Sequence, residues 1–293
     1  MSKAMLCVII TALCFTTHEP VSKLFAADIN PYAVTAIRFF IGSLFLLPFS
    51  FRQMKKDNIK PTGRDLLIMC GMGVLFICVS MVLLQVGVAV GESPALIAII
   101  FSSNSIITII LSAIFLKSKL TPLKIIGIAL CVGGVLVSAD LSKGSNILSV
   151  CLALGAALVF SAYTVLCKKY MTRISGVIQA GFTFFFGSVI LIIILLIMGV
   201  DLVGGISSGN ILQLLYVAVV VTGVGYLCFY IAINKGGPQL AATAFLIKPS
   251  LTPFATYFIN GIAPGMVVFV GLALMVAGMY LSNRTPSGKI EKK

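Results

Sequence analysis

Long apolar runs separated by short polar clusters are the main pattern of this sequence. Most runs are about 20 residues long, the length of an α-helix that crosses the hydrocarbon core of a bilayer. Breaking the chain at clusters of charge, glycine and proline gives ten apolar segments: 4–26, 31–51, 65–90, 94–116, 122–139, 147–168, 176–199, 210–234, 239–259 and 265–283. The pattern therefore predicts an all-α integral membrane protein with ten transmembrane helices.

Composition supports a membrane protein and argues against other classes. The 293 residues are 59% hydrophobic and 10% charged, whereas soluble domains carry about 25% charged residues. The net charge of +13 lies in short clusters between apolar runs and not on one basic face, so we expect no nucleic-acid binding. The eight cysteines form no CxxC motif and the chain has one histidine, so we expect no metal site and no cofactor.

The positions of lysine and arginine predict the orientation in the membrane. Seventeen of the 21 basic residues lie at the N-terminus, in alternate connections or in the C-terminal tail, whereas the opposite connections contain a single lysine, Lys143. Cytoplasmic loops carry the excess of basic residues, so we expect a multi-pass protein of the cell membrane with both termini in the cytoplasm. The other three basic residues, Lys23, Arg38 and Lys248, lie inside predicted helices.

The two halves of the chain resemble each other at an offset of about 145 residues. "RFFIGS" (38–43) aligns with "TFFFGS" (183–188), and "GIALCVGGVLVS" (127–138) aligns with "GLALMVAGMYLS" (271–282). Several segments that keep one offset indicate an internal repeat. Each copy, 1–143 and 144–293, would hold five helices, and the odd number inverts the second copy in the membrane. Inverted repeats are typical of secondary transporters.

These motifs resemble the EamA-like group of the drug/metabolite transporter superfamily. The resemblance rests on two five-helix halves, a lysine near the end of the first helix of each, "RFFIGSLFLLP", and "LTPLKIIGIALCVGGVLVS". It implies a permease of ten helices that moves a small solute. The sequence departs from the usual "GERLTP" motif, because Ser118 and Asn260 stand where a glutamate is expected. No role of that glutamate is therefore carried over to this chain.

The cluster "HEPVSK" (18–23) places ionisable side chains inside the first predicted helix. Such groups usually face a cavity and have a partner. Glu19 and Arg38 lie at similar depth on adjacent helices, so we expect them to pair, with Lys23 one turn above Glu19. Pro20 removes a backbone hydrogen bond and should bend the helix. The cluster predicts either a substrate or proton site or a structural ion pair between two helices.

Other polar residues in the predicted helices are candidates for the same site. Lys248 lies near the membrane midplane, beside a helix break expected at Pro249, and we expect it to face the cluster of the first helix. His18 is either a proton shuttle or a neutral hydrogen-bonded group. The remaining substrate-binding or coupling candidates are hydrogen-bonding side chains in the spans: Gln85, Ser103, Asn104, Tyr163, Tyr226 and Tyr230.

Together these features predict a secondary transporter that works by alternating access. An amino acid or related metabolite is the favoured substrate, because Arg38 and Lys248 suit an anionic group; export is the favoured direction, and protons are the candidate coupling ion. The alternatives are an exporter of drugs or amphipathic cations, a membrane-embedded enzyme, or an accessory protein. Expected partners are the solute and membrane lipids, and the chain is expected to act as a monomer or homodimer.

Overall fold

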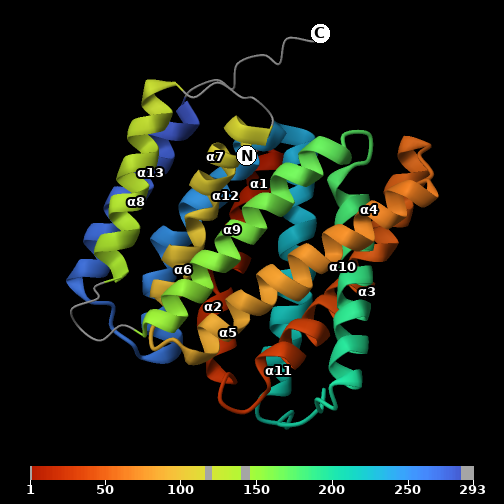
Figure 1. Ribbon diagram of the computed structural model, residues 1–293, viewed down its shortest axis with the longest axis horizontal. Coiled ribbons are helices and arrows are strands. Elements are labelled where there is room, and N and C mark those ends of the chain that lie inside the picture. The colour runs from red at the N-terminus through yellow and green to blue at the C-terminus, as the bar shows by residue number, and fades with distance from the viewer. Residues whose placement is uncertain (1, 116–120, 140–145, 285–293) are drawn as a thin grey trace.

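The computed structural model describes residues 2–115, 121–139 and 146–284, and within these ranges the regular secondary structure is helical (Figure 1). The first half of the chain contains α1 (Lys3–Thr16), α2 (His18–Leu24), α3 (Pro31–Asp57), α4 (Gly63–Gly73), η1 (Val74–Met81), α5 (Val82–Val90), α6 (Pro94–Ser102), α7 (Asn104–Phe115) and α8 (Pro122–Ala139). The second half contains α9 (Ile147–Tyr170), α10 (Gly176–Ile197), α11 (Ile211–Leu215), η3 (Tyr216–Gly225), α12 (Tyr226–Asn260) and α13 (Met266–Arg284). The elements η1 and η3 are π-helical stretches inside longer helices.

Local sequence explains where several helices begin and end. Asn30 precedes α3, and its side-chain oxygen accepts a hydrogen bond from the backbone N–H of Tyr32 (2.9 Å), as N-cap residues do. The helix ends at Asn58, whose φ of 52° lies in the left-handed region that closes many helices. Thr62 and Asp65 form a capping box at the start of α4. The polar clusters predicted to separate the apolar segments therefore contain the signals that stop and restart the helices.

Seven helical stretches are long and apolar enough to cross a membrane, and the prediction of an all-α membrane protein is confirmed for the described residues. These candidate spans are Lys3–Leu24, Pro31–Asp57, Gly63–Val90, Pro94–Phe115, Ile147–Tyr170, Gly176–Ile197 and Ile211–Lys235. Two more predicted segments appear as shorter apolar helices, Pro122–Val137 and Met266–Leu281. The remaining predicted segment, 239–259, lies within α12.

Helix α12 contains a reversal of the chain, although its backbone is assigned as helical throughout. Phe229 and Phe245 are 16 positions apart, and a straight helix would separate them by about 24 Å. Their ring centroids are 5.3 Å apart, and both rings contact Phe15 of α1. The chain therefore turns back between these positions, where the sequence predicts the connection "NKGGPQ" (234–239), and α12 forms two arms.

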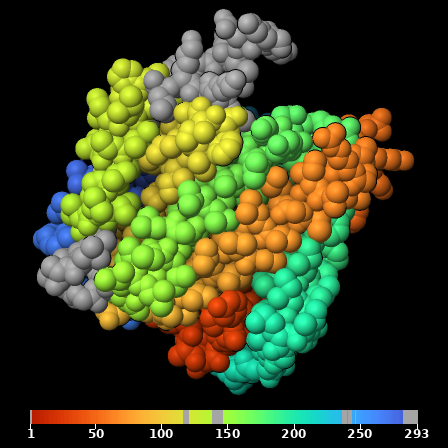
Figure 2. Space-filling view, in the orientation of Figure 1, coloured from red at the N-terminus to blue at the C-terminus, as the bar shows by residue number. Residues whose placement is uncertain are grey.

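Helices from the two halves pack against each other at positions occupied by glycine. A Cβ added at Gly187 of α10 would lie 2.5 Å from the backbone oxygen of Gly73 in α4, so the two backbones touch. Helices α8 and α13 approach each other in the same way, because a Cβ at Gly134 would lie 2.6 Å from the oxygen of Gly271. Figure 2 shows helices of the two halves side by side on the surface, where α9 (green) lies beside α4 and α5 (orange).

The outer surface is rich in exposed apolar side chains, whereas aromatic rings fill the interior. Ile197 and Phe258 are 80% and 81% exposed, as expected for side chains that face lipid. Inside the protein, Phe184 contacts Phe39 and Tyr226, with ring centroids 5.1 Å and 4.9 Å apart. Tyr226 of this aromatic core lines the cavities described next.

Candidate functional site

The first predicted helix is interrupted at Thr17, which separates α1 from α2. The Thr17 hydroxyl donates to the carbonyl of Cys14 (3.0 Å) and lies 2.8 Å from the hydroxyl of Tyr216. Pro20, in the first turn of α2, has no N–H and cannot donate to the carbonyl of residue 16. The interruption lies three residues before Pro20, where the sequence predicts a bend, and it places the polar cluster on a separate short helix.

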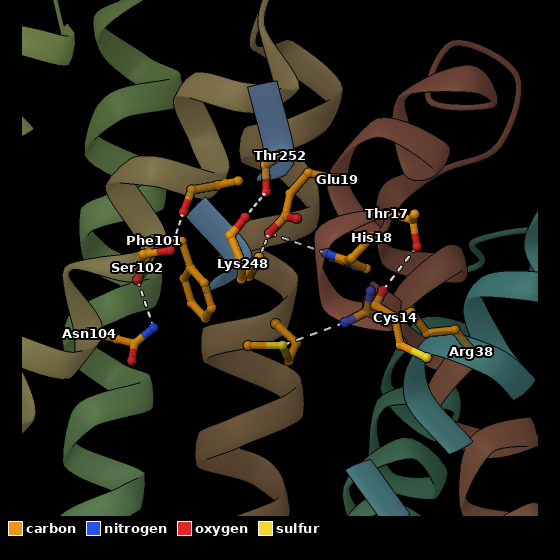
Figure 3. Close-up of polar contacts among 12 residues, drawn as sticks. Cys14, Thr17, His18, Glu19, Arg38, Phe101, Ser102, Asn104, Lys248 and Thr252 are labelled. Carbon is orange, nitrogen blue, oxygen red and sulfur yellow. Dashed lines mark hydrogen bonds and ion pairs between the residues drawn. The ribbon is translucent and has the colours of Figure 1, made fainter. Parts of the chain in front are cut away.

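Glu19 of α2 forms a buried ion pair with Lys248 of α12. The Lys248 Nζ lies 2.6 Å from Glu19 Oε1, and the two side chains are 5% and 0% exposed. His18 Nδ1 lies 3.5 Å from the same oxygen, and Lys248 Nζ lies 5.3 Å from the ring centroid of Phe101 in α6. Figure 3 shows these side chains converging. The structure thus brings Lys248 to the cluster of the first helix, as expected, while their role in transport stays a prediction.

The predicted pair between Glu19 and Arg38 is wrong. Arg38 of α3 is 3% exposed, its Nη2 donates to the Met81 sulfur at 3.5 Å, and its guanidinium lies 4.6 Å from the Phe39 ring centroid. Its Nε and Nη1 have no hydrogen-bond partner among the described residues. Similar depth on neighbouring helices does not fix the direction of a side chain around each helix axis, and Glu19 turns toward α12.

Lys23 also differs from the prediction, because it does not pair with Glu19. Its Nζ donates to the backbone oxygens of Val88 (3.3 Å), Ala89 (3.0 Å) and Gly91 (2.5 Å). The last carbonyls of a helix have no intrahelical donor, and a cation near them is favourable. Lys23 therefore ties α2 to the C-terminal end of α5.

The fourth predicted helix is interrupted at Ser103, between α6 and α7. Asn104 begins α7, and its side-chain amide donates to the carbonyl of Phe101 (2.8 Å). The backbone carbonyl of Asn104 accepts a hydrogen bond from the Ser161 hydroxyl of α9 (2.8 Å). The Ser103 hydroxyl is buried and has no hydrogen-bond partner among the described residues. The polar patch "SSN" thus holds a break in this helix against α9.

The helix break predicted at Pro249 is wrong. Helix α12 continues through Pro249, and the reversal lies before Phe245. A proline removes one backbone donor, which buried transmembrane helices tolerate when the surrounding hydrogen bonds persist. The hydroxyl of Thr252 also donates to the Lys248 carbonyl (2.8 Å).

A cavity of about 370 Å³, called the main cavity below, lies beside this cluster. Helices of both halves line it, with hydroxyl groups from α7 on one side and aromatic rings from α9 and α12 on the other. The lining residues are Asn104, Ser105, Thr108, Ile109, Ser112, Phe160, Tyr163, Thr164, Val165, Cys167, Lys168, Gln179, Tyr226, Phe229, Tyr230, Ile233, Phe245 and Met279. Lys168 is exposed, so the main cavity reaches the surface at the basic end of the protein.

A smaller cavity of about 30 Å³, called the Arg38 chamber below, lies next to the ion pair. Arg38, His18 and Lys248 line it. Three aromatic side chains line both cavities and therefore stand between them: Phe160, Tyr226 and Phe245. The main cavity is thus large and partly lined by aromatic rings, whereas the Arg38 chamber is small and partly lined by ionisable side chains.

The predicted site residues fall into three groups. Asn104, Tyr163, Tyr226 and Tyr230 line the main cavity. His18, Arg38 and Lys248 line the Arg38 chamber, and Glu19 pairs with Lys248. Lys23, Gln85 and Ser103 line neither cavity. Gln85 is buried, and its amide has no hydrogen-bond partner within the described ranges.

The sequence analysis missed the hydroxyl groups of α7 and half of the aromatic lining, namely Phe160, Phe229 and Phe245. Ser105, Thr108 and Ser112 line the main cavity, and their spacing of three and four residues puts them on one face of a helix. That spacing was the available signal. The arrangement suits binding of a solute with an apolar body. Among the described residues, no group of three or more His, Cys, Asp or Glu side chains could hold a metal ion.

Comparison with known proteins identifies the family. The chain matches the EamA-like transporter family over residues 2–139 and 147–284. A protein of Clostridium kluyveri named an uncharacterized transporter is 32% identical over 296 residues, and the match covers 97% of this chain and 95% of that protein. The chain therefore belongs to the EamA-like transporter family: it is a transporter and not an enzyme, and its apolar helices make it a multi-pass membrane protein.

Two further similarities are informative. A probable terminal-alkyne amino-acid exporter of Streptantibioticus cattleyicolor is 25% identical over 237 residues, which cover 78% of this chain and 77% of the exporter. A solved crystal structure matches with a TM-score of 0.70 and 16% identity, covering 96% of both chains. At this identity the structural match shows the fold alone.

Proposed function

We propose that this member of the EamA-like transporter family moves a small solute across the cell membrane by alternating access. The main cavity is the observation that carries the proposal, because both halves of the chain line it and aromatic rings separate it from buried charges. Its volume of about 370 Å³ suits a small molecule, since such sites occupy roughly 300–1,000 Å³. A single chain lines the cavity, so we propose a monomer as the transporting unit, with a homodimer as the alternative.

The proposal includes ten transmembrane helices in two inverted repeats, 1–143 and 144–293. The offset of 145 relates Gly42 to Gly187 and Gly73 to Ala218. A Cβ at Gly42 would lie 3.0 Å from the oxygen of Ala218, and a Cβ at Gly187 would lie 2.5 Å from the oxygen of Gly73. Such reciprocal contacts are what a two-fold axis produces, so they support the inverted repeat.

Contacts between repeat-related aromatic residues give independent support. Phe39 contacts Phe184, with ring centroids 5.1 Å apart, and Phe40 contacts Phe185, with centroids 6.2 Å apart. Each pair is related by the same offset of 145, and a residue contacts its own counterpart when both lie near the symmetry axis. The proposed two-fold axis would then lie between α3 and α10.

The orientation is part of the proposal, with both termini in the cytoplasm. The main cavity reaches the surface beside Lys168, in the basic segment "KKYMTRIS" (168–175), and cytoplasmic loops carry the excess of basic residues. At the opposite end, Lys23 ties α2 to α5, and the Asn260 side chain donates to the carbonyl of Pro20 (3.0 Å). The structure would then represent a state that is open inward and closed outward.

We propose an amino acid or related metabolite as substrate and export as the direction. The likeness to a probable amino-acid exporter supports both, and access to the main cavity from the basic end is what an exporter needs to load its substrate. The aromatic lining also suits an amphipathic cation, so a drug-like cation is the alternative substrate.

For coupling, we propose that the ion pair between Glu19 and Lys248 opens and closes during transport. Two buried charges 2.6 Å apart compensate each other, and a proton or a charged solute that takes one partner leaves the other unpaired. His18, at 3.5 Å from Glu19, is positioned to exchange a proton with the carboxylate.

Counterflow in proteoliposomes tests this function. Vesicles that contain the purified protein are loaded with an unlabelled amino-acid mixture, and uptake of radiolabelled L-phenylalanine and L-leucine is measured, with tetraphenylphosphonium as the cation probe. We expect Glu19→Gln and Lys248→Ala to reduce flux at least about tenfold, because each leaves a buried group unpaired. Arg173→Gln removes a mostly exposed partner of Asp65 and should leave flux unchanged.

Each result decides between the alternatives. Cation flux without amino-acid flux would favour the drug exporter, and the absence of flux for every probe would refute the transport proposal for these solute classes. Normal flux in the Glu19→Gln and Lys248→Ala variants, combined with lower unfolding temperatures, would show that the pair is structural. Stimulation of flux by an imposed pH gradient, lost in Glu19→Gln, is the result expected for proton coupling.

A further inference from the structure

We propose that the Arg38 chamber is a carboxylate subsite, which receives the anionic head of a solute whose apolar body lies in the main cavity. This inference rests on the proposed transport function and specifies its substrate as an amphipathic carboxylate. It depends on three observations: the unpaired guanidinium, the excess of positive charge around it, and the position of the chamber behind the aromatic lining.

The Arg38 guanidinium is built into the protein with most of its hydrogen-bonding capacity unused. Arg38 is 3% exposed, its Nε and Nη1 have no partner among the described residues, and Nη2 contacts the Met81 sulfur at 3.5 Å. A thioether is a weak acceptor. A buried charge without partners is costly unless another group satisfies it for part of the cycle. Figure 3 shows the guanidinium pointing from α3 toward the cluster of the first helix.

The surroundings of Arg38 carry more positive than negative charge. Lys248 and Arg38 both line the chamber, and Glu19, the acidic group beside them, already pairs with Lys248 at 2.6 Å. Within the described ranges no carboxylate lies within ion-pair distance of Arg38. His18 also faces the chamber and adds no negative charge. An arriving anion would therefore balance the cluster, whereas a cation would add to its repulsion.

The size of the chamber fits a carboxylate better than a bulkier anion. A cavity needs about 10–15 Å³ on this measure to hold one water molecule, so the Arg38 chamber of about 30 Å³ has room for about two water-sized groups. A carboxylate offers two oxygens to the fork of a guanidinium. With Nη1 unpaired and Nη2 on a sulfur atom, this fork is available.

The aromatic residues between the cavities determine the kind of solute. Phe160, Tyr226 and Phe245 line both compartments, so a head group in the chamber lies directly next to the rings of the main cavity. A solute that bridges the two needs an anionic end and an apolar or aromatic body.

Binding to the purified protein tests the inference without requiring transport. Isothermal titration compares 3-phenylpropionate and L-phenylalanine with the amides 3-phenylpropanamide and L-phenylalaninamide, which keep the shape and lose the carboxylate. Phenyl phosphate tests whether the chamber binds a larger oxyanion. We expect each carboxylate to bind wild type at least about tenfold more tightly than its amide, since a hydrogen bond to a charged group contributes about 1.5–3 kcal/mol, or about 10- to 100-fold.

Variants of arginines on the same helix make the test specific. Arg38→Gln and Arg38→Lys should each weaken carboxylate binding about 10- to 100-fold and leave binding of the neutral 3-phenylpropanamide unchanged. Lysine keeps the charge of arginine and lacks its fork. Arg52→Gln removes an exposed arginine from the end of α3 and should bind like wild type. Without solute, Arg38→Met should unfold at or above the wild-type temperature, because it removes an unpaired buried charge.

The inference and the proposed function can fail separately. Equal binding of carboxylates and amides, tighter binding of phenyl phosphate, or full carboxylate binding by folded Arg38→Gln would overturn the subsite, even if the protein transports solutes. A lower unfolding temperature for ligand-free Arg38→Met would show a structural role and would also overturn it. Carboxylate preference that depends on Arg38, without flux in vesicles, would support the subsite and refute the proposed transport of these solutes.

Discussion

The ion pair between Glu19 and Lys248 gives the most quantitative prediction. Both side chains are nearly inaccessible, and their charged atoms are 2.6 Å apart. Glu19 Oε2 has no hydrogen-bond partner among the described residues, so Lys248 and His18 provide the contacts of the carboxylate. Removing one partner of a buried pair leaves the other charge uncompensated, which costs about 3–5 kcal/mol.

A double-mutant cycle separates this cost from the loss of the side chains themselves. We expect Glu19→Gln and Lys248→Met each to lower the free energy of unfolding by about 3–5 kcal/mol. The double variant should recover most of this loss, because two neutral side chains need no ion pair. The coupling energy between the two sites should then be at least about 3 kcal/mol, at or above the upper end of the range seen for residues in direct contact.

The assay is unfolding of the purified protein in mixed micelles with increasing denaturing detergent, followed by circular dichroism. Arg173→Gln serves as the control, because the Arg173 side chain, which pairs with Asp65, is 56% exposed. Exposed ion pairs contribute only about 0–1 kcal/mol to the free energy of unfolding. Additive losses in the double variant, with no recovery, would refute the reasoning. They would mean that the two groups do not compensate each other in the folded protein.

Three further predictions follow from contacts elsewhere in the protein. Lys23→Met should raise amide hydrogen exchange in α2 about tenfold or more, since two carbonyls of α5 and the carbonyl of its C-cap Gly91 lose a charged donor. The exposed Lys55→Met is the control and should not change it. Gly73→Ala should destabilise the protein by about 1–3 kcal/mol, because its Cβ would meet the backbone of α10. Gly71→Ala is the control: its Cβ would have no neighbouring atom within 4 Å, so this variant should be neutral or stabilised by up to about 1 kcal/mol. Thermal unfolding distinguishes the two variants. In a background without native cysteines, Ser112→Cys in the main cavity should react with an impermeant thiol reagent faster in inside-out than in right-side-out vesicles, and equal rates would contradict an inward-open state.

The helices of this protein were largely predictable, because their signals are local. Apolar length, proline, glycine and charge clusters located most helix ends, and Pro20 located the break between α1 and α2. Pro249 gave a wrong prediction, since a proline inside a buried helix removes one hydrogen bond and the surrounding packing can hold the helix. Ser103 and the reversal within α12 lie where polar or glycine-rich stretches interrupt the apolar pattern.

The sequence predicted part of the set of residues at the candidate site, but it did not predict how these residues pair. Ionisable residues at membrane depth must be satisfied inside the protein, and this rule alone selected Glu19, Arg38 and Lys248. Depth along a helix follows from the sequence, but the direction of a side chain around the helix axis depends on how the helices pack. The sequence pattern therefore could not show that Glu19 turns toward α12 and leaves Arg38 unpaired.

The same limit applies to Lys23 and to the main cavity. Lys23 has a sequence neighbour of opposite charge, Glu19, at the favourable helical spacing, yet it binds carbonyls of α5 because the end of that helix lies closer in space. The rings of Phe229 and Phe245 line the cavity only because the chain reverses between them. Both features depend on tertiary packing, which a pattern within one segment does not contain.

The ion pair has consequences for how the two proposed repeats exchange conformations. Glu19 and Lys248 align with Thr164 and Ser103 in the other repeat, and these two cannot form an ion pair. If the repeats exchange conformations across the two-fold axis, the glycine and phenylalanine contacts can be reproduced in the second state, but the ion pair cannot. The pair therefore favours the state in which it forms, with α2 held against α5 and α12. A carboxylate that binds Arg38 reduces the excess positive charge around Lys248 and Arg38. The charge on the solute, and not the helix contacts that both repeats share, would therefore decide when the exchange occurs.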